Sequence, residues 1–267
     1  MRYLVEDKKK YGNMQFIKKW FLFDKVIDNS LPLPADASSI IVNGVLRGSE
    51  KRILEAQTRK IPWIYFDNGY FGKSYRVSIC QTAPTKILPS TYSEIKNFTF
   101  MPWVGGTGES ILVLPPSIPY IHAFGLGYFL NEVIYKLSQI SGREIIVRTK
   151  SLPGYPEKEN DIKEQIDNCR IMVTWGSAVS LEALERGKPT ISLGWCPGRP
   201  LSFGMQDIET RALEKEPDRH KLFNSLTYAS FSECDLEKGT DIYEKYLRNA
   251  FSEYMNLKGP VFKHLKG

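Results

Sequence analysis

The chain has 267 residues, of which 42% are hydrophobic and 25% charged, and its formal net charge is +6. A chain of this length and composition can bury a substantial core, as one large domain or two small ones. No apolar run approaches the roughly 20 residues that a membrane-spanning helix needs. The first ten residues, MRYLVEDKKK, carry charges where a signal peptide would be apolar. We therefore expect a cytoplasmic protein without a membrane span.

Cysteines and histidines are few and scattered. The four cysteines form no CxxC pair, which supports neither a disulfide framework nor a zinc site; they are Cys80, Cys169, Cys196 and Cys234. Three histidines are too few for a histidine-rich metal site; they are His122, His220 and His264. We expect reduced cysteines, no bound metal and no cofactor.

The positive charge is concentrated in the first hundred residues. They hold 16 Lys and Arg against 9 Asp and Glu, a balance of +7, whereas the remainder holds 20 and 21, a balance of −1. A basic half favours a polyanionic partner such as nucleic acid; the alternative is that the excess only aids solubility. The basic residues concerned are Lys8–Lys10, Lys18, Lys19, Arg47, Lys51, Arg52, Arg59 and Lys60.

In the first half of the chain, strands and helices are expected to alternate. The predicted strands are Tyr3–Glu6, Ser39–Val42, Trp63–Phe66 and Tyr75–Ile79. The predicted helices are Met14–Val26 and Ser49–Arg59, the second with Ser49 as its N-cap. Such alternation predicts a parallel, doubly wound sheet.

A change of pattern separates the two halves. Residues 80–110 are rich in proline and contain Gly105-Gly106-Thr107-Gly108, which predicts an irregular connector or an acceptor-side loop. Alternation then resumes with strands at Ile111–Leu114 and Glu144–Arg148 and helices at Gly127–Ile140 and Glu159–Asn168. We therefore predict one domain at 1–108, a second at 109–240, and a C-terminal segment at 241–267. Its amphipathic helix, Asp241–Met255, would pack back on the first domain.

The most informative segment is RIMVTWGSAVSLEALERGKPTISL, Arg170 to Leu193. It reads as strand, tight turn, helix, turn and strand, with Gly176-Ser177 opening the helix and Gly187-Lys188-Pro189 ending it. The N-terminus of such a helix presents unpaired N–H groups and a partial positive charge, which suit a phosphate or diphosphate. The alternative is an ordinary strand–helix–strand unit that binds only water.

The pattern Thr-Trp-x-Ser-x-x-x-Leu-Glu-Ala-x-x-x-Gly-Lys-Pro within this segment resembles the donor-binding segment of GT-B glycosyltransferases. It covers about a tenth of the chain. The resemblance implies an α/β fold with two Rossmann-like parallel-sheet domains that face a cleft. It also implies that Ser177 faces the diphosphate of a nucleotide sugar and that Glu182 binds the ribose. Trp175, Gly176 and Ala178 complete the implied donor site.

Other candidate residues follow predicted strands, because ligands of open α/β sheets bind outside the carboxyl ends of the strands. Arg148 and Lys150 could flank the diphosphate in place of a metal, or belong to an ordinary basic loop. Asp67 is the first candidate for a general base, against a structural role as a turn former in Asp-Asn-Gly. His122 is the second candidate, against a core histidine. The candidate acceptor-binding residues are Arg47, Asn68, Tyr70 and Arg76.

Several motifs are absent from the sequence: DxD, GxxxxGK[ST], GxSxG and HExxH. Metal-dependent GT-A chemistry, P-loop NTPases, hydrolases and metalloproteases therefore have no motif to support them. We expect a metal-independent glycosyltransferase that uses a nucleotide sugar, with UDP as the expected nucleotide.

The basic first half of the chain favours DNA with hydroxymethylated bases, such as hydroxymethylcytosine, as the acceptor. The phage-type DNA glycosyltransferases, which the chain resembles, use such an acceptor. An enzyme of this type would act in the cytoplasm of an infected host cell. Aromatic residues in the middle of the chain could stack on a flipped base. The alternatives are a sugar transferase for surface polysaccharide, similar to bacterial capsule-type enzymes, and a non-catalytic nucleotide-binding protein.

Overall fold

The computed structural model describes residues 1–6, 18, 21, 23–45, 48–84, 86–87, 98–149 and 162–232. The chain divides into two compact units. Unit 1 comprises Met1–Thr82, Pro119–Gly125 and Thr227–Gly267, and unit 2 comprises Ala83–Ile118 and Leu126–Leu226. The segment 83–108, expected at the end of the first domain, thus belongs to unit 2. The C-terminal helix and segment expected at 241–267 lie outside the described residues.

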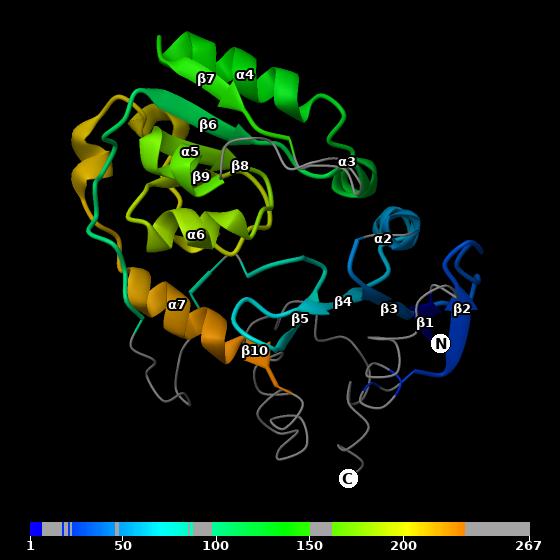
Figure 1. The fold of residues 1–267 in the computed structure, drawn as a ribbon. Helices are drawn as coiled ribbons and strands as arrows, with labels where there is room; N and C mark the ends of the chain where they lie inside the picture. Colours follow the sequence, from blue (N-terminus) through cyan, green and yellow to red (C-terminus); the bar gives the residue numbers. More distant parts are fainter. Residues whose placement is uncertain are drawn as a thin grey trace. The chain divides into compact units, whose positions relative to one another are not determined.

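A mixed sheet forms the centre of unit 1 (Figure 1). Its strands, in the spatial order β10-β5-β4-β3-β1-β2, are β10 (Ser230–Phe231), β5 (Tyr75–Ile79), β4 (Trp63–Asn68), β3 (Ser39–Asn43), β1 (Arg2–Glu6) and β2 (Lys25–Asp28). The four strands β1 to β4 are parallel. Strand β5 runs antiparallel to β4, and β10 antiparallel to β5. The parallel sheet predicted for the first half therefore carries two antiparallel strands at one edge.

Two local predictions for unit 1 were wrong. The helix expected to reach Val26 is replaced at its end by β2, because Lys25–Asp28 pairs in parallel with β1 and buries Ile27. Ser49 does not cap helix α2 (Ser49–Thr58): Gly48 is the N-cap residue, with a φ of 97°. The Ser49 hydroxyl instead donates to the carbonyl of Gly44 at 2.9 Å.

Unit 2 contains a fully parallel sheet in the order β7-β6-β8-β9 (Figure 1). Its strands are β6 (Ser110–Leu114), β7 (Glu144–Val147), β8 (Cys169–Thr174) and β9 (Thr190–Ser192). The connecting helices include α4 (Phe129–Ile140), α5 (Ile162–Asn168) and α6 (Val179–Glu185). Each of these elements overlaps a strand or helix that the periodicity of the sequence predicts.

Alternate residues of the central strands of unit 2 face opposite cores. Ile111 and Ile171 pack with Val133 and Leu137 of α4 on one face of the sheet. Leu112 and Met172 pack with residues of α5 and α6, such as Ile166 and Ala183, on the other. Because successive side chains of a strand point to opposite faces, this alternation covers both faces of the sheet with helices.

The sequence did not predict the remaining elements. They are α3 (Ile118–Phe124), α7 (Arg219–Tyr228), β10, and three short 3₁₀ helices, η1 (Arg199–Leu201), η2 (Met205–Asp207) and η3 (Arg211–Glu214). Within the described part of the chain, no helix combines the length and apolar character that crossing a membrane requires.

The same strand order occurs in both units. The parallel strands β2-β1-β3-β4 and β7-β6-β8-β9 both follow the order second, first, third, fourth. This is the doubly wound arrangement, so the predicted class, α/β with two Rossmann-like units, is confirmed. The chain order reverses between β1 and β3 in unit 1 and between β6 and β8 in unit 2. Ligands of doubly wound sheets bind outside the carboxyl ends of the strands at such a switch point.

Candidate functional site

The switch point of unit 2 is formed by the carboxyl ends of β6 and β8. Leu114 pairs with Thr174, and Thr174 pairs with Ser192, so these three residues form one row at this edge of the sheet. The buried Thr174 hydroxyl donates to the carbonyl of Leu114 at 3.1 Å and accepts the N–H of Ser177 at 3.4 Å. A side chain of β8 thereby fixes the predicted donor turn beside the switch point.

Helix α6 begins with fewer open N–H groups than the sequence predicted. The Ser177 hydroxyl accepts the N–H of Val179 at 3.2 Å, and the Ser177 carbonyl accepts the N–H of Ser180, also at 3.2 Å. The helix is only seven residues long, which limits its dipole. An anion at this turn would meet the Ser177 hydroxyl and few backbone donors, so a phosphate here needs another source of positive charge.

Glu182 lies on α6 between residues that face the core. Leu181 and Ala183 are buried, whereas Glu182 is half-buried. No hydrogen bond joins its carboxylate to any residue in the described ranges. This carboxylate can therefore accept hydrogen bonds from a ligand, as binding a ribose would require.

The loop after β9, in which no site residue was predicted, contacts the donor turn. Trp195 meets Trp175 edge to face, with ring centroids 5.9 Å apart. A Cβ on Gly194 would lie 2.4 Å from the Trp175 ring, so only glycine allows this packing. The buried Cys196 thiol contacts the Ser177 carbonyl at 3.2 Å. Burial raises the pKa of this thiol, which keeps it protonated as a donor.

Of the two cations predicted for the donor side, Arg148 lies further from β8 than the donor turn does. Arg148 follows β7, which is separated from β8 by β6, a distance of roughly 10 Å across the sheet. Its Nη1 donates to the amide oxygen of Gln165 on α5 at 2.8 Å. Lys150 lies outside the described residues.

Four of the residues predicted for catalysis and acceptor binding come together in unit 1. Asp67 and Asn68 are the last residues of β4 rather than a turn after it, and Arg76 stands opposite Asp67 on β5. Arg76 Nη2 donates to Asp67 Oδ2 at 2.9 Å. The Arg76 guanidinium also lies 4.8 Å from the centroid of the Tyr70 ring. Arg47, predicted for the same role, lies outside the described residues.

The Asp67 carboxylate accepts three hydrogen bonds. Besides Arg76, the Tyr65 hydroxyl donates to Oδ2 at 2.6 Å, and the N–H of Asn68 donates to Oδ1 at 2.8 Å. Burial and the neighbouring Tyr120 and Asp67 raise the pKa of Tyr65 well above its ordinary value of 10. Tyr65 therefore keeps its proton at neutral pH and is a hydrogen-bond donor. The three hydrogen bonds occupy most of the lone pairs of the Asp67 carboxylate.

His122 lies on α3, on the segment that returns to unit 1. Within this unit, Tyr120 of α3 reaches the Tyr65 hydroxyl at 3.4 Å, and Phe124 packs on Trp63 with centroids 6.4 Å apart. The His122 side chain is exposed and makes no hydrogen bond with the described part of the chain. It is not the core histidine of the alternative interpretation.

Tyr65 and Tyr120 are not among the site residues predicted from the sequence. Tyr65 could have been found from the strand pattern, because it shares a face of β4 with Asp67 two residues later. Nothing in the sequence pattern brings Tyr120 to the same place.

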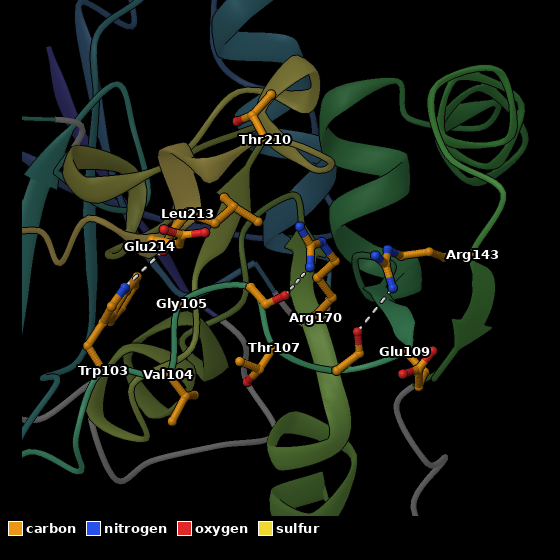
Figure 2. Close-up of a pocket in the computed structure, with 12 residues that line it drawn as sticks. Trp103, Val104, Gly105, Thr107, Glu109, Arg143, Arg170, Thr210, Leu213 and Glu214 are labelled. Carbon is orange, nitrogen blue, oxygen red and sulfur yellow. Dashed lines mark hydrogen bonds between the residues drawn. The ribbon is translucent and has the colours of Figure 1, made fainter.

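A cavity of about 700 Å³ lies at the opposite edge of the unit 2 sheet, beside the amino ends of β6 and β8 (Figure 2). Its lining residues are Trp103, Val104, Gly105, Gly106, Thr107, Gly108, Glu109, Arg143, Arg170, Thr210, Leu213 and Glu214. The predicted connector thus forms one wall. Close packing explains why the connector has glycines at two of these positions. A Cβ on Gly105 would lie 2.7 Å from the carbonyl oxygen of Leu213, and a Cβ on Gly108 would lie 2.6 Å from the carbonyl oxygen of Asn168.

The arginines of this cavity already have protein partners. Arg143 Nη1 donates to the carbonyl of Gly108 at 3.2 Å, and Arg170 donates to the carbonyl of Gly106, as the dashed lines of Figure 2 show. Both arginines also pair with Glu209, at 2.8 and 3.8 Å. These contacts join the connector to the segment before η3. We therefore interpret the cavity as a structural junction and place the candidate site at the carboxyl edge of the sheet.

Comparison with known proteins gave likeness in structure only. No known protein family matches the sequence, and no curated protein matches it. Among solved structures, the β-Kdo 2,4 transferase of KpsC from Thermosulfurimonas dismutans matches with a TM-score of 0.44 and 14% identity, over 85% of this chain and 90% of that one. The β-Kdo 2,7 transferase of KpsC from the same organism matches with a TM-score of 0.45 and 11% identity, over 84% and 89%.

Proposed function

We propose that the protein is a glycosyltransferase that takes its sugar from a nucleotide-sugar donor bound at the carboxyl edge of unit 2. One observation carries the proposal: the turn at Ser177 and the carboxylate of Glu182, which has no hydrogen-bond partner among the described residues, both follow β8 beside the β6–β8 switch point. A doubly wound sheet binds nucleotides at this place. In the proposal, the Ser177 hydroxyl contacts the diphosphate and Glu182 binds the ribose hydroxyls.

The proposed reaction is transfer to a hydroxyl group. The acceptor oxygen bonds to the anomeric carbon, the bond from that carbon to the diphosphate oxygen breaks, and the nucleoside diphosphate leaves with the electron pair. A general base takes the proton of the acceptor hydroxyl. Protein cations neutralise the charge that develops on the diphosphate, so the proposal requires no metal ion.

We assign the base role to His122 in preference to Asp67. The Asp67 carboxylate already accepts hydrogen bonds from Arg76, Tyr65 and Asn68, whereas the imidazole of His122 is exposed. A base needs a lone pair that the acceptor proton can reach. In this assignment, Asp67 is a positioning residue that holds the buried guanidinium of Arg76 in place.

For the acceptor, the charges of unit 1 favour a saccharide hydroxyl over DNA. Arg52 and Arg59 both pair with Glu55 and donate to carbonyls of residues 31–35, and Lys18 pairs with Glu6. These three basic residues are therefore engaged with the protein itself, which leaves them less available for contacts with the phosphates of DNA. DNA with hydroxymethylated bases is the second candidate, carried by the balance of +7 in the first hundred residues.

The test measures donor use and acceptor choice together. The protein is incubated with UDP-, GDP-, ADP- and CDP-linked sugars, alone and with either a polysaccharide fragment or DNA containing hydroxymethylcytosine. Release of the nucleotide and mass spectrometry of the acceptor report transfer. Sugar added to the polysaccharide fragment, and not to DNA, is the expected result. Sugar on the DNA would show that DNA is the acceptor. Binding of nucleotide sugars without release of the nucleotide in any mixture would show that the protein is a non-catalytic nucleotide-binding protein.

A matched pair of variants tests the site itself. Glu182→Gln removes the negative charge and one acceptor oxygen from the proposed ribose contact, and Glu185→Gln makes the same change on the exposed side of the same helix. We expect Glu182→Gln to raise KM for the donor about tenfold or more, as the loss of a hydrogen bond to a charged group predicts, and Glu185→Gln to leave it unchanged. Equal KM values in the two variants would show that Glu182 does not bind the donor and that the donor site does not include α6.

A further inference from the structure

Arg199 lies at the carboxyl edge of unit 2, one strand away from the donor turn. It opens η1, after the loop that follows β9. Its Nη1 donates to the carbonyl of Ser192, the last residue of β9, and Ser192 pairs with Thr174 on β8. Since neighbouring strands are about 4.8 Å apart, this anchor holds the guanidinium near the Ser177 turn.

The loop that carries Arg199 has a fixed course. The N–H of Arg199 donates to the carbonyl of Cys196 at 2.9 Å, and the N–H of Gly198 donates to the Ser180 hydroxyl at 3.2 Å. A Cβ on Gly198 would lie 2.8 Å from the Ser180 side chain, so the loop sits directly against α6. The position of Arg199 is thereby tied to the helix that carries the candidate donor residues.

Arg199 differs from most arginines of unit 2 in having no carboxylate partner within the described residues. Four other arginines of unit 2 pair with carboxylates: Arg143 and Arg170 with Glu209, Arg186 with Asp167, and Arg219 with Glu216. Arg199 is exposed, and no carboxylate within the described ranges lies in ion-pair distance of it. Among the described residues, only Ser192 accepts a hydrogen bond from this guanidinium, which leaves four of its five N–H groups for a ligand.

We propose that Arg199 binds the phosphate groups of the nucleotide donor and neutralises the charge of the leaving diphosphate. The inference rests on the proposed function. It names the residue that supplies the positive charge that a phosphate at the Ser177 turn requires. The first N–H groups of α6 are used within the turn, and Arg148 lies on the far side of β6. A guanidinium presents paired N–H donors that match phosphate oxygens, and such charge-assisted contacts are about twice as strong as neutral ones.

The experiment measures nucleotide affinity by isothermal titration calorimetry. UDP, GDP, ADP and CDP are titrated into the full chain, and the tightest binder is compared with its nucleoside. The variants are Arg199→Gln, which removes the charge, and Arg199→Lys, which keeps it without the paired donors. Arg211→Gln, an exposed arginine of η3 near the opposite edge of the sheet, is the matched control. Thermal unfolding of each variant confirms that it is folded.

We expect Arg199→Gln to weaken binding of the nucleoside diphosphate about 10- to 100-fold and to leave binding of the nucleoside unchanged. Arg199→Lys should fall between the wild type and Arg199→Gln, and Arg211→Gln should match the wild type. Wild-type affinity for the diphosphate in both Arg199 variants would overturn the inference while leaving the donor site intact. A wild-type protein that binds none of the four nucleotides would overturn the proposed function together with it.

Discussion

Arg76 stands directly opposite Asp67 across the antiparallel strands β4 and β5, and Arg76 Nη2 lies 2.9 Å from Asp67 Oδ2. The guanidinium is the less exposed partner, at 14% against 30% for the carboxylate. Tyr65 and Tyr70 cover it, with ring centroids 5.6 and 4.8 Å from its central carbon. Asp67 therefore stabilises a buried cation. A carboxylate that is paired with this cation is less available as a general base.

The first prediction concerns the stability of this pair. Asp67→Asn leaves the buried guanidinium without its counter-charge, so we expect it to lower the free energy of unfolding by about 2 kcal/mol, with partial exposure of Asp67 moderating the loss. Urea denaturation measures it. The double variant Asp67→Asn/Arg76→Met should lose less than the sum of the single variants, because it buries no unpaired charge. Strictly additive losses would show that the pair contributes no coupling.

The second prediction separates the two candidate bases. We expect His122→Asn to lower kcat by about 100- to 10,000-fold, which is the range for loss of a general base, without changing the urea midpoint, because its side chain is exposed. Steady-state kinetics on the acceptor identified by product analysis measures it. Asp67→Asn, compared at a temperature where both variants are folded, should retain more activity. The reverse order of kcat would return the base role to Asp67.

Strand and helix periodicity predicted most of unit 2, because its central strands bury both faces. Ile111 to Leu114 is apolar throughout, as a strand covered by helices on both sides must be. The turn at Gly187 was also predictable, since its φ of 75° suits glycine. Val26 was misassigned because an edge strand has a weak pattern, and its pairing with Leu4 is a long-range contact that local periodicity does not encode.

The candidate site was only partly predictable for a related reason. Ser177 and Glu182 stand in one continuous segment, so their spacing is visible in the sequence. Arg199 and Trp195 reach the same edge through a loop after β9, and only the strand order reveals that β9 is the neighbour of β8. Asp67 looked like a turn residue because the sequence does not show that β5 folds back antiparallel and places Arg76 opposite it.

The third prediction is a loss of stability in acid that depends on Glu209. The hydrogen bond from Arg143 is the main cause that lowers the pKa of Glu209 below its ordinary value of 4.5. The unfolded chain therefore binds the proton first as the pH falls, so the stabilisation is present above pH 4.5 and is lost as the pH drops through the lower folded pKa. Urea midpoints between pH 3 and 6 measure this loss, and we expect a smaller decline in Glu209→Gln. An identical decline in both proteins would exclude Glu209 as a source.

The fourth prediction concerns Arg219, which is 4% exposed. Its Nη1 donates to the carbonyls of Met101 and Leu184 at 3.0 and 2.9 Å, and its guanidinium lies 4.7 Å from the centroid of Phe100. We expect Arg219→Met to lower the free energy of unfolding by about 3 kcal/mol, because two carbonyls lose a charged donor. Lys221→Met, an exposed change on the same helix, should stay within about 0.5 kcal/mol of the wild type. Denaturation in urea compares them, and similar midpoints would mean that water replaces the arginine.

The fifth prediction uses two glycines to separate backbone strain from crowding. Gly187 and Gly72 have φ values of 75° and 59°, but a Cβ on Gly187 would lie 2.0 Å from the carbonyl oxygen of Pro102, whereas one on Gly72 meets nothing within 4 Å. Gly72→Ala should therefore cost only the left-handed conformation, about 1 kcal/mol. Gly187→Ala must also displace the backbone at Pro102, so we expect a loss at least about 2 kcal/mol larger. Urea denaturation of the two variants gives the difference. Equal losses would mean that the segment at Pro102 yields freely, and α6 would then not be held by its contact with that segment.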